Sequence, residues 1–167
     1  MLLVTGVNGG LGGLVLERLR GRAGVVAGSR TPGTVPEDTP ARLVDFDRPE
    51  TLAEAFKDVR TLLLISAGAA EDDVVIARHG AAIEAAETAG VEHVVYTSLS
   101  GDGDHLPYAL AHRWTERRLR ESGALRWTVL RNGLYAELLA AIAAPGPAGV
   151  ITAPLGAGRL AAVARAD

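Results

Sequence analysis

The sequence contains no cysteine among its 167 residues. This absence excludes disulfide bonds, thiolate catalysis and cysteine-ligated metal, and we expect no metal centre. It also agrees with a reducing compartment, so we expect a cytoplasmic protein. Lysine is nearly absent as well, since Lys57 is the only one. Any mechanism that needs a second lysine is therefore excluded.

The sequence also lacks an excess of basic charge and any long hydrophobic run. Its net charge of −3 at pH 7 provides no basic surface for nucleic acid. No apolar run approaches the roughly 20 residues that a membrane helix needs. The first apolar run, MLLV, has no basic segment before it and does not resemble a signal peptide. We therefore expect neither a nucleic-acid partner nor a membrane.

What the sequence does contain is an alternation of short apolar runs with helical patterns. The apolar runs predict strands at 2–5, 23–30, 41–47, 59–66, 91–101 and 125–133. Apolar residues at helical spacing predict helices at 11–22, 47–56, 72–90, 112–123 and 134–144. This alternation predicts an α/β fold of the Rossmann type, a doubly wound parallel sheet with helices on both faces. The whole chain, residues 1–167, is expected to form this single domain.

Two local patterns refine this interpretation. Asp47 and Glu50 have the spacing of an N-terminal capping box for the helix that begins there. Residues 149–163 predict two short strands around a glycine turn.

The stretch TGVNGGLG at 5–12 follows a predicted strand and opens a predicted helix. In this context Gly6 allows a tight turn, Gly9 lets the backbone approach a pyrophosphate, and Gly12 lets helix and strand pack closely. The free N–H groups of the helix terminus then face the phosphates. The alternative is a flexible glycine turn with no ligand. The expected cofactor contacts of the loop are Thr5, Gly6, Asn8, Gly9, Gly10, Leu11 and Gly12.

The end of the second predicted strand bears on which dinucleotide binds. A site selective for NAD has an acidic residue about 20 positions after the glycine loop, whereas here the strand ends in GSRTP. Ser29 and Arg30 stand where a ribose 2′-phosphate would lie, and a guanidinium binds phosphate in a bidentate manner. The sequence therefore predicts NADP(H) in preference to NAD(H). The alternative is that Arg30 is a solvated arginine.

Three further segments carry a resemblance to a known family: LLLIS at 62–66, RHGAAIEAAETAGVEHVVYTSLSG at 78–101 and LRNGLYAELL at 130–139. Together they resemble the NmrA-like atypical short-chain dehydrogenases. Within that family they are most similar to the group of type 2 NAD(P)H:quinone oxidoreductases and triphenylmethane reductases. The resemblance extends over essentially the whole chain.

The resemblance implies further cofactor contacts at the ends of the predicted strands. Asp45 would accept a hydrogen bond from the adenine amino group with Phe46 beside the ring, although a turn or capping role is the alternative for Asp45. The residues implied for the ribose and nicotinamide half are Ser66, Ala67, Gly68, Thr97, Ser98, Asn132, Gly133, Leu134, Tyr135 and Arg165.

Short-chain dehydrogenases typically use a serine with a Tyr-x-x-x-Lys pair, and this sequence departs from that pattern. Tyr108-Ala-Leu-Ala-His112 places a histidine at the lysine position, so the implied catalytic residues are Ser98, Tyr108 and His112. The alternative for His112 is a pair with Glu116 on a solvated helix face. His79 lies on an apolar helix face and is expected to be a packed core residue. Hydride transfer to a quinone needs no strong protein acid, so the departure agrees with that chemistry.

In similar proteins, the segment Arg165 to Asp167 opens a further helix and a region that covers the substrate cleft. We therefore expect this chain to lack that covering region, and the apolar surface so exposed would favour a homodimer. The function expected is NADPH-dependent hydride transfer to a quinone or a similar conjugated small molecule. The alternatives are a non-catalytic NADP-sensing regulator and, ranked last, a nucleotide-sugar epimerase.

Overall fold

The computed structural model describes residues 1–67, 70–101, 109–143, 149–150 and 161–167. Its main sheet contains six parallel strands in the order β3-β2-β1-β4-β5-β6. Their bounds are Leu2–Val4 for β1, Val25–Ser29 for β2, Ala41–Leu43 for β3, Thr61–Leu64 for β4, His93–Leu99 for β5 and Arg126–Asn132 for β6. This is the strand order of the doubly wound dinucleotide-binding fold, so the predicted fold class is confirmed.

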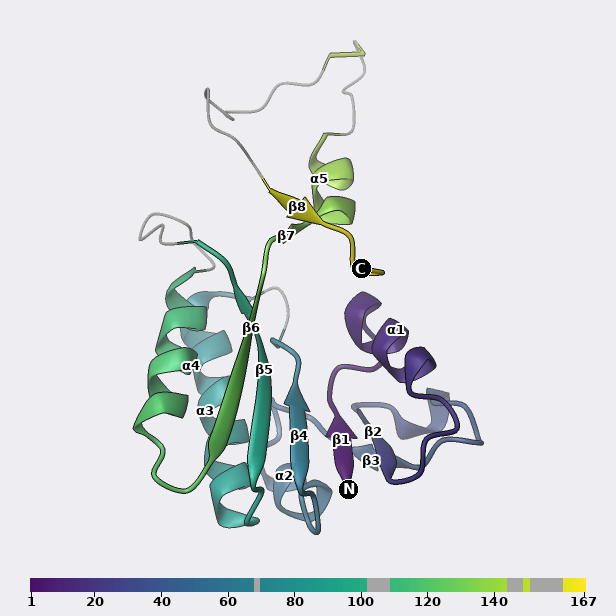
Figure 1. The fold of residues 1–167 in the computed structure, drawn as a ribbon, viewed down its shortest axis with the longest axis vertical. Helices are drawn as coiled ribbons and strands as arrows, with labels where there is room; N and C mark the ends of the chain where they lie inside the picture. Colours follow the sequence, from purple (N-terminus) through teal and green to yellow (C-terminus); the bar gives the residue numbers. More distant parts are fainter. Residues whose placement is uncertain (68–69, 102–108, 144–148, 151–160) are drawn as a thin grey trace.

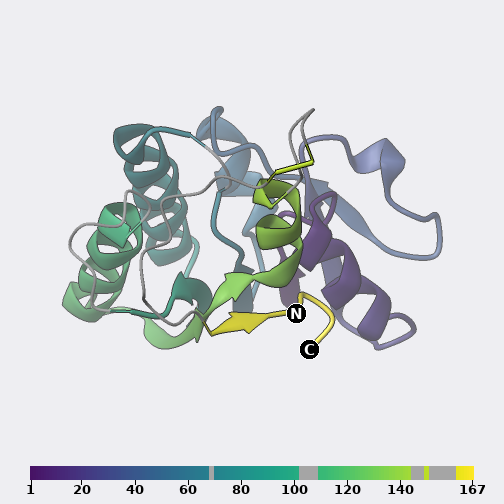
Figure 2. The same ribbon diagram turned by 90° about the horizontal axis from the view of Figure 1, so that it is seen from above.

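Helices cover both faces of this sheet (Figures 1 and 2). The helix α1 (Gly10–Arg18) packs on one face, where Val15, Leu16 and Leu19 contact Val4 and Ala27. The other face carries α2 (Glu50–Ala55), α3 (Asp72–Thr88) and α4 (Ala109–Glu121). The larger core lies under these three helices and contains Leu52, Phe56, Leu62, Leu64, Ile83, Val94, Tyr96 and Leu119, each with less than 1% of its surface exposed.

A small second unit lies beyond the carboxyl ends of the strands (Figure 1). It consists of β7 (Leu134–Tyr135), α5 (Ala136–Ile142) and β8 (Ala162–Val163), and β7 pairs with β8 in parallel. A Cβ atom on Gly133 would lie 2.6 Å from the carbonyl oxygen of Ala161, so glycine permits this close approach. Arg18 of α1 donates a hydrogen bond to the Ala166 carbonyl at 3.0 Å and ties the last residues to the main domain.

Several predicted boundaries shift in the structure. The helix after the glycine loop ends at Arg18 rather than at 22, and α4 begins at Ala109 rather than at 112. The third strand is limited to Ala41–Leu43. Of the predicted strand pair at 149–163, residues 151–160 lie outside the described residues, and the described part, β8, pairs with β7.

The predicted capping box is wrong. Pro49 occupies the N-cap position of α2, and no side chain caps that helix. The Asp47 carboxylate bonds to Arg78 of α3 instead, because a guanidinium that offers two parallel N–H groups is a stronger partner than one backbone N–H. Among the residues that the structure describes, no helix is both long and apolar enough to cross a bilayer.

Candidate functional site

Two pockets lie at the carboxyl ends of the strands, next to the point where the strand order reverses between β1 and β4. We name the first the glycine pocket, because it is lined by the glycine loop; its volume is about 560 Å³. The second, the His112 pocket, has a volume of about 650 Å³ and borders His112 and the segment 132–135. Both are lined by Leu11, Ile65, Ser66 and Arg165. The two pockets therefore form one continuous cleft.

The glycine loop brings the backbone of α1 to the wall of the glycine pocket. Gly6 has a φ of +66°, which an L side chain rarely adopts, and makes the turn out of β1. A Cβ atom on Gly12 would lie 2.2 Å from the Gly6 carbonyl oxygen, so only glycine allows α1 to pack this closely on the turn. Gly10 and Leu11 open the helix, where backbone N–H groups have no partner within the helix. The geometry suits an anionic group at this terminus.

Arg30 lies at the rim of the glycine pocket, directly after β2. Its side chain is exposed, and no hydrogen bond or ion pair joins it to any residue that the structure describes. Ser29 beneath it is buried, donates its hydroxyl hydrogen to Asn8 Oδ1, and accepts a hydrogen bond from the Thr31 N–H at 2.9 Å. The rim thus presents an exposed guanidinium, which interacts with the Asp47 carboxylate only through its charge, next to a fixed hydroxyl.

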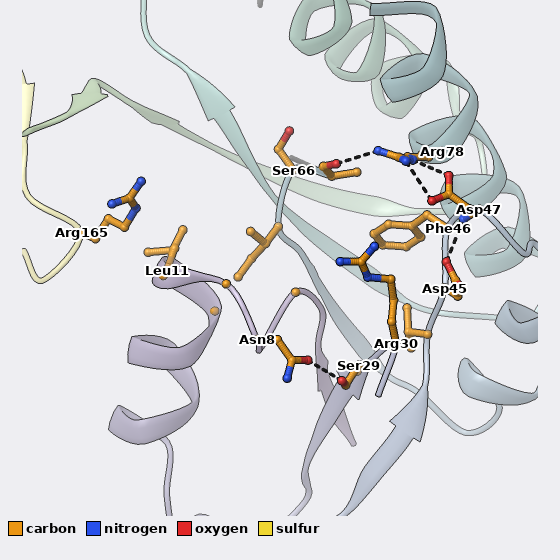
Figure 3. Close-up of a pocket in the computed structure, with 18 residues that line it drawn as sticks. Asn8, Leu11, Ser29, Arg30, Asp45, Phe46, Asp47, Ser66, Arg78 and Arg165 are labelled. Carbon is orange, nitrogen blue, oxygen red and sulfur yellow. Dashed lines mark hydrogen bonds and ion pairs between the residues drawn. The ribbon is translucent and has the colours of Figure 1, made fainter. Parts of the chain in front are cut away.

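The opposite wall of the glycine pocket is held by Arg78, which the sequence analysis did not predict. The Arg78 guanidinium donates to Asp47 Oδ1 at 2.7 Å and Oδ2 at 2.9 Å, and to the Ala67 carbonyl at 3.2 Å (Figure 3). These bonds lower the pKa of Asp47. Arg78 therefore connects the loop after β3 to the loop after β4 along this wall of the pocket. The pairing partners are 31 residues apart in sequence, so no local pattern shows them.

Asp45 and Phe46 line the same wall (Figure 3). The Asp45 carboxylate accepts hydrogen bonds from the Asp47 N–H at 3.1 Å and from Arg48 Nε at 3.0 Å. The turn role left open for Asp45 is therefore present. Its carboxylate borders the pocket while it is held in this turn.

His79 is buried under the cleft and holds the loop after β4. The Ala67 N–H donates to His79 Nε2 at 3.0 Å, so Nε2 carries no hydrogen. Nδ1 then donates to Thr115 Oγ1 at 2.8 Å, and the Thr115 hydroxyl donates to the Ala111 carbonyl at 2.7 Å. Burial is the main cause that lowers the pKa of His79 to about 3, so the ring is neutral. The expected core role of His79 is confirmed.

In the His112 pocket, Thr97 and Ser98 lie near the end of β5, just before Leu99, and their hydroxyls are already bonded. Thr97 Oγ1 accepts the Ser66 N–H at 3.0 Å, and the Ser98 hydroxyl donates to Glu116 Oε1 at 2.7 Å. Glu116 is buried and also accepts from Arg131 and Arg120 at 2.6 Å each. The hydrogen bond from Arg131 is the main cause that lowers the pKa of Glu116 to about 2. Ser98 is left with lone pairs but no free hydrogen.

His112 does not pair with Glu116, so that alternative is wrong. Its Nδ1 lies 2.6 Å from the hydroxyl of Tyr96, and the ring lines the pocket. The face of α4 that carries His112 and Glu116 packs on β5. Thr115 and Glu116 are buried there, so this face is not solvated. Burial lowers the pKa of His112.

Arg165 lies where the two pockets meet. Its guanidinium carbon is 4.6 Å from the centre of the Tyr135 ring, and its Nη1 is 3.6 Å from Glu137 Oε2. A Cβ atom on Gly10 would come within 3.2 Å of Arg165 Cδ, so the side chain lies directly over the first turn of α1. Figure 3 shows Arg165 and Leu11 on one side of the glycine pocket and Arg78 on the other.

The structure brings most of the predicted residues to the cleft. Those that line the glycine pocket are Gly6, Asn8, Gly9, Gly10, Leu11, Gly12, Ser29, Arg30, Asp45, Phe46, Ser66, Ala67 and Arg165. The His112 pocket is lined by Leu11, Ser66, Thr97, Ser98, His112, Asn132, Gly133, Leu134, Tyr135 and Arg165.

Three predicted residues are not among them. Thr5 is fully buried, and its hydroxyl donates to the Leu63 carbonyl at 3.1 Å and accepts the Ile65 N–H at 3.0 Å. Because it connects β1 to β4 inside the sheet, Thr5 is a structural residue and not a wall of the pocket. Gly68 and Tyr108 lie outside the described residues.

The lining residues that were not predicted come from strands, from the loops that follow β3 and β4, and from α3 and α5. In the glycine pocket they are Gly28, Val44, Asp47, Ile65 and Arg78. In the His112 pocket they are Ile65, Ala70, Glu71, Asp72, Val75, Leu99 and Leu138. Ile65 and Ala70 could have been found, because they flank the predicted segment 66–68. Within the described part of the chain, no cluster of three or more His, Asp or Glu residues is arranged to hold a metal ion.

Comparison with known proteins now identifies the ligand class. The model of a family described as NAD(P)H-binding matches residues 6–139. An NmrA-like family domain-containing oxidoreductase of Aspergillus flavus is 38% identical over 148 residues, which cover 81% of this chain and 48% of the relative. Quinone oxidoreductase 2 of Escherichia coli is 35% identical over 176 residues, which cover 100% of this chain and 60% of the relative.

Solved structures agree with these relatives. Triphenylmethane reductase of Citrobacter sp. superposes with a TM-score of 0.84 at 30% identity, over 99% of this chain and 61% of that chain. The Escherichia coli quinone oxidoreductase in complex with NADPH superposes with a TM-score of 0.76 at 35% identity, over 86% of this chain and 52% of that chain. The resemblance to NmrA-like reductases is confirmed. The chain spans 48% and 60% of the lengths of the two curated relatives.

Proposed function

Since this chain belongs to the NAD(P)H-binding family, we propose that it is a reductase that transfers hydride from NADPH to a quinone or a similar conjugated acceptor. The observation that carries the proposal is the continuous cleft, in which a helix N-terminus with free N–H groups, the exposed guanidinium of Arg30 and a mainly apolar pocket follow one another. A pocket of a few hundred Å³ with more apolar than polar surface, such as the His112 pocket, is typical of a small-molecule site.

The residues along the cleft follow one another in an order that would fit the successive parts of a dinucleotide. Adenine would occupy the glycine pocket against Phe46 and Asp45, and the pyrophosphate would lie at the N-terminus of α1 beneath Arg165. The nicotinamide would enter the His112 pocket beside Thr97 and Ser98. When bound, NADPH supplies the hydride. The residues of the chain would bind the cofactor, orient it against the acceptor and keep water away from the reacting atoms.

The preference for NADPH over NADH rests on Arg30. The guanidinium lies just after the end of β2, where the ribose of the adenine half would be, and makes no hydrogen bond or ion pair with a described residue, although its charge helps to lower the pKa of Asp47. No carboxylate occupies this position to bind a ribose 2′-hydroxyl, since β2 ends at Ser29 and Arg30 follows it. A guanidinium that makes no ion pair within hydrogen-bond distance has its N–H groups available to a 2′-phosphate.

The acceptor preference rests on the lining of the His112 pocket. Its walls carry Leu99, Leu134 and Leu138 with the Tyr135 ring, which suit a flat apolar molecule. Hydride addition to a conjugated carbonyl yields a stabilised anion, so no strong acid is needed in the pocket. The names of the relatives support this class of acceptor.

A fluorescence titration with NADPH and NADH, followed by addition of a quinone, tests the proposal. We expect NADPH to bind more tightly than NADH, and its absorbance to fall only when the quinone is present. Binding without quinone-dependent oxidation would contradict the reductase and favour the NADP-sensing regulator.

Arg30→Gln tests the cofactor preference separately. A charge-assisted hydrogen bond contributes about 1.5–3 kcal/mol, so the Kd for NADPH should rise about tenfold to a hundredfold. The Kd for NADH should change by less than about threefold, because NADH lacks the 2′-phosphate. Arg20→Gln, which removes an exposed arginine paired with Asp38, is the matched control. Equal losses for both cofactors would disprove the assignment.

A further inference from the structure

His112 is anchored from inside the protein and not from the solvent. The hydroxyl of Tyr96 on β5 lies 2.6 Å from His112 Nδ1 on α4. Tyr96 is fully buried, whereas His112 is partly exposed and lines the pocket. The phenol therefore fixes one ring nitrogen at the back of the pocket and leaves the rest of the ring at its wall.

The chemistry of the two groups decides which of them holds the shared hydrogen. A phenol is a stronger hydrogen-bond donor than a neutral imidazole N–H, and an imidazole nitrogen is a better acceptor than a hydroxyl oxygen. Burial raises the pKa of Tyr96 and lowers the pKa of His112, so both groups are uncharged near neutral pH. The hydroxyls of Ser66 and Thr115 also lie near the phenol. Thr115 gives its one hydrogen to the Ala111 carbonyl, so Ser66 is the hydroxyl with a hydrogen to offer the phenol oxygen. Tyr96 then donates to Nδ1.

A neutral imidazole has one N–H, so an acceptor at Nδ1 places the hydrogen on Nε2. Among the described residues, none bonds to His112 Nε2. Resting on the function proposed above, we infer that His112 Nε2–H is an uncharged donor to the oxygen of the acceptor that is reduced, and that Tyr96 is the positioning residue that keeps the hydrogen on Nε2.

The acceptor would receive hydride, one hydrogen with two electrons, from a C–H bond of bound NADPH, which would be oxidised to NADP⁺. A carbonyl π bond of the acceptor would open, and its oxygen would take the negative charge. The Nε2–H bond to that oxygen becomes stronger as the charge develops, which is how a positioned donor lowers a barrier. The proton that completes the reduction comes from water after the product leaves. His112 ends the step with the hydrogen it began with.

His79 provides an internal comparison for the same chemistry. It also contacts the Tyr96 ring, with ring centres 5.5 Å apart, but both of its nitrogens are bonded inside the protein. Its geometry assigns the hydrogen to Nδ1, the opposite of His112. Both ring nitrogens of His79 are thus bonded inside the protein, whereas His112 keeps an N–H that faces the pocket.

Long-range ¹H–¹⁵N spectra of protein labelled with ¹⁵N-histidine test the position of the hydrogen without cofactor or turnover. We expect His112 to show the Nε2–H form and His79 the Nδ1–H form, with His112→Gln identifying the signal. Tyr96→Phe should convert His112 to a mixture of the two forms. An Nδ1–H form in the wild type, or an unchanged spectrum in Tyr96→Phe, would overturn the inference.

Turnover then tests the donor. His112→Leu removes the N–H and should lower kcat with a quinone about 10²-fold, whereas His112→Gln offers an amide N–H and should recover part of it. The Kd for NADPH should stay within about threefold in both variants, since the loss lies in the step and not in cofactor binding. A kcat for His112→Leu within about threefold of the wild type would overturn the role.

If the wild type shows no quinone-dependent oxidation, the proposed function fails and the donor is tested by binding alone. Duroquinone is added to the labelled protein. A selective shift of the His112 Nε2 signal supports the donor. No shift at saturating quinone disproves it.

Discussion

The glycine pocket and the His112 pocket adjoin, yet they are built in different ways. The glycine pocket is made mainly of backbone: a turn at Gly6, a close contact at Gly12 and the first N–H groups of α1. The His112 pocket is made of side chains bonded in pairs, Tyr96 with His112 and Ser98 with Glu116. A backbone site suits a constant group such as a pyrophosphate. In a site made of side chains, substitutions can change which acceptor fits without changing the backbone of the sheet.

Gly12→Val should have the largest effect on stability and cofactor binding, because it adds a side chain at the tightest backbone contact of the glycine pocket. A Cβ atom would lie 2.2 Å from the Gly6 carbonyl oxygen, which forces α1 away from the turn. We expect the free energy of unfolding to fall by about 1–3 kcal/mol or more and binding of both cofactors to be lost. Urea unfolding and NADPH titration measure this. Gly33→Ala, where a Cβ atom meets nothing within 4 Å, is the control. Retained binding in Gly12→Val would contradict the backbone account.

Arg78→Met should lower the affinity for NADPH and NADH equally, by about tenfold. The guanidinium connects Asp47 to the Ala67 carbonyl and so fixes the walls of the glycine pocket, whichever cofactor is bound. Arg118→Met is a matched control, because Arg118 bonds Glu87 at 3.0 and 2.6 Å away from the cleft. If both variants weaken cofactor binding alike, Arg78 acts through general stability and has no special role at the pocket.

Glu116→Gln should change the acid stability of the His112 side more than it changes cofactor binding. The pKa of Glu116 is about 2 in the folded chain against an ordinary value of 4.5. A carboxyl with a lowered pKa adds stability above its unfolded value and loses it as the pH falls toward its folded value. The wild type should therefore lose this contribution between pH 4.5 and about 2, and Glu116→Gln should not. Thermal unfolding over that range decides it, and parallel curves would refute the ion-pair account.

Thr5→Val should have the smallest effect on the site. The hydroxyl bonds the Leu63 carbonyl and the Ile65 N–H, so its loss should cost about 1–2 kcal/mol of stability. The Kd for NADPH should not change, because Thr5 lines neither pocket. A large loss of affinity for NADPH with an unchanged free energy of unfolding would show that Thr5 contacts the cofactor after all. Ligand titration and urea unfolding separate the two results.

The same contrast explains what the sequence could predict. The glycine loop was predictable because its geometry depends on residues adjacent in sequence: Gly6 has a positive φ, and Gly12 packs directly against the Gly6 carbonyl. Fold class followed from the alternation of apolar runs and helical patterns, which the six parallel strands confirm.

The side-chain bonds were not predictable, because they join residues far apart in sequence. Tyr96 and His112 are 16 residues apart and Arg78 and Asp47 are 31 apart, so each pair exists only after the strands and helices dock. Asp47 was assigned to a cap for the same reason, since only its local neighbours were visible in the sequence. Thr5 directly precedes Gly6 in sequence and was assigned to the loop for that reason, but its hydroxyl bonds to β4 and to Ile65, which follows it.

The buried ring of His79 has a consequence for the exchange of protons between the protein and its buffer. In the unfolded chain this imidazole takes up a proton below its ordinary pKa of 6.5, whereas in the folded chain it does so only near 3. Between those values every molecule that folds releases that proton to the buffer, and stability falls as the medium becomes more acidic. The heat of unfolding measured by calorimetry will therefore depend on the ionisation enthalpy of the buffer chosen.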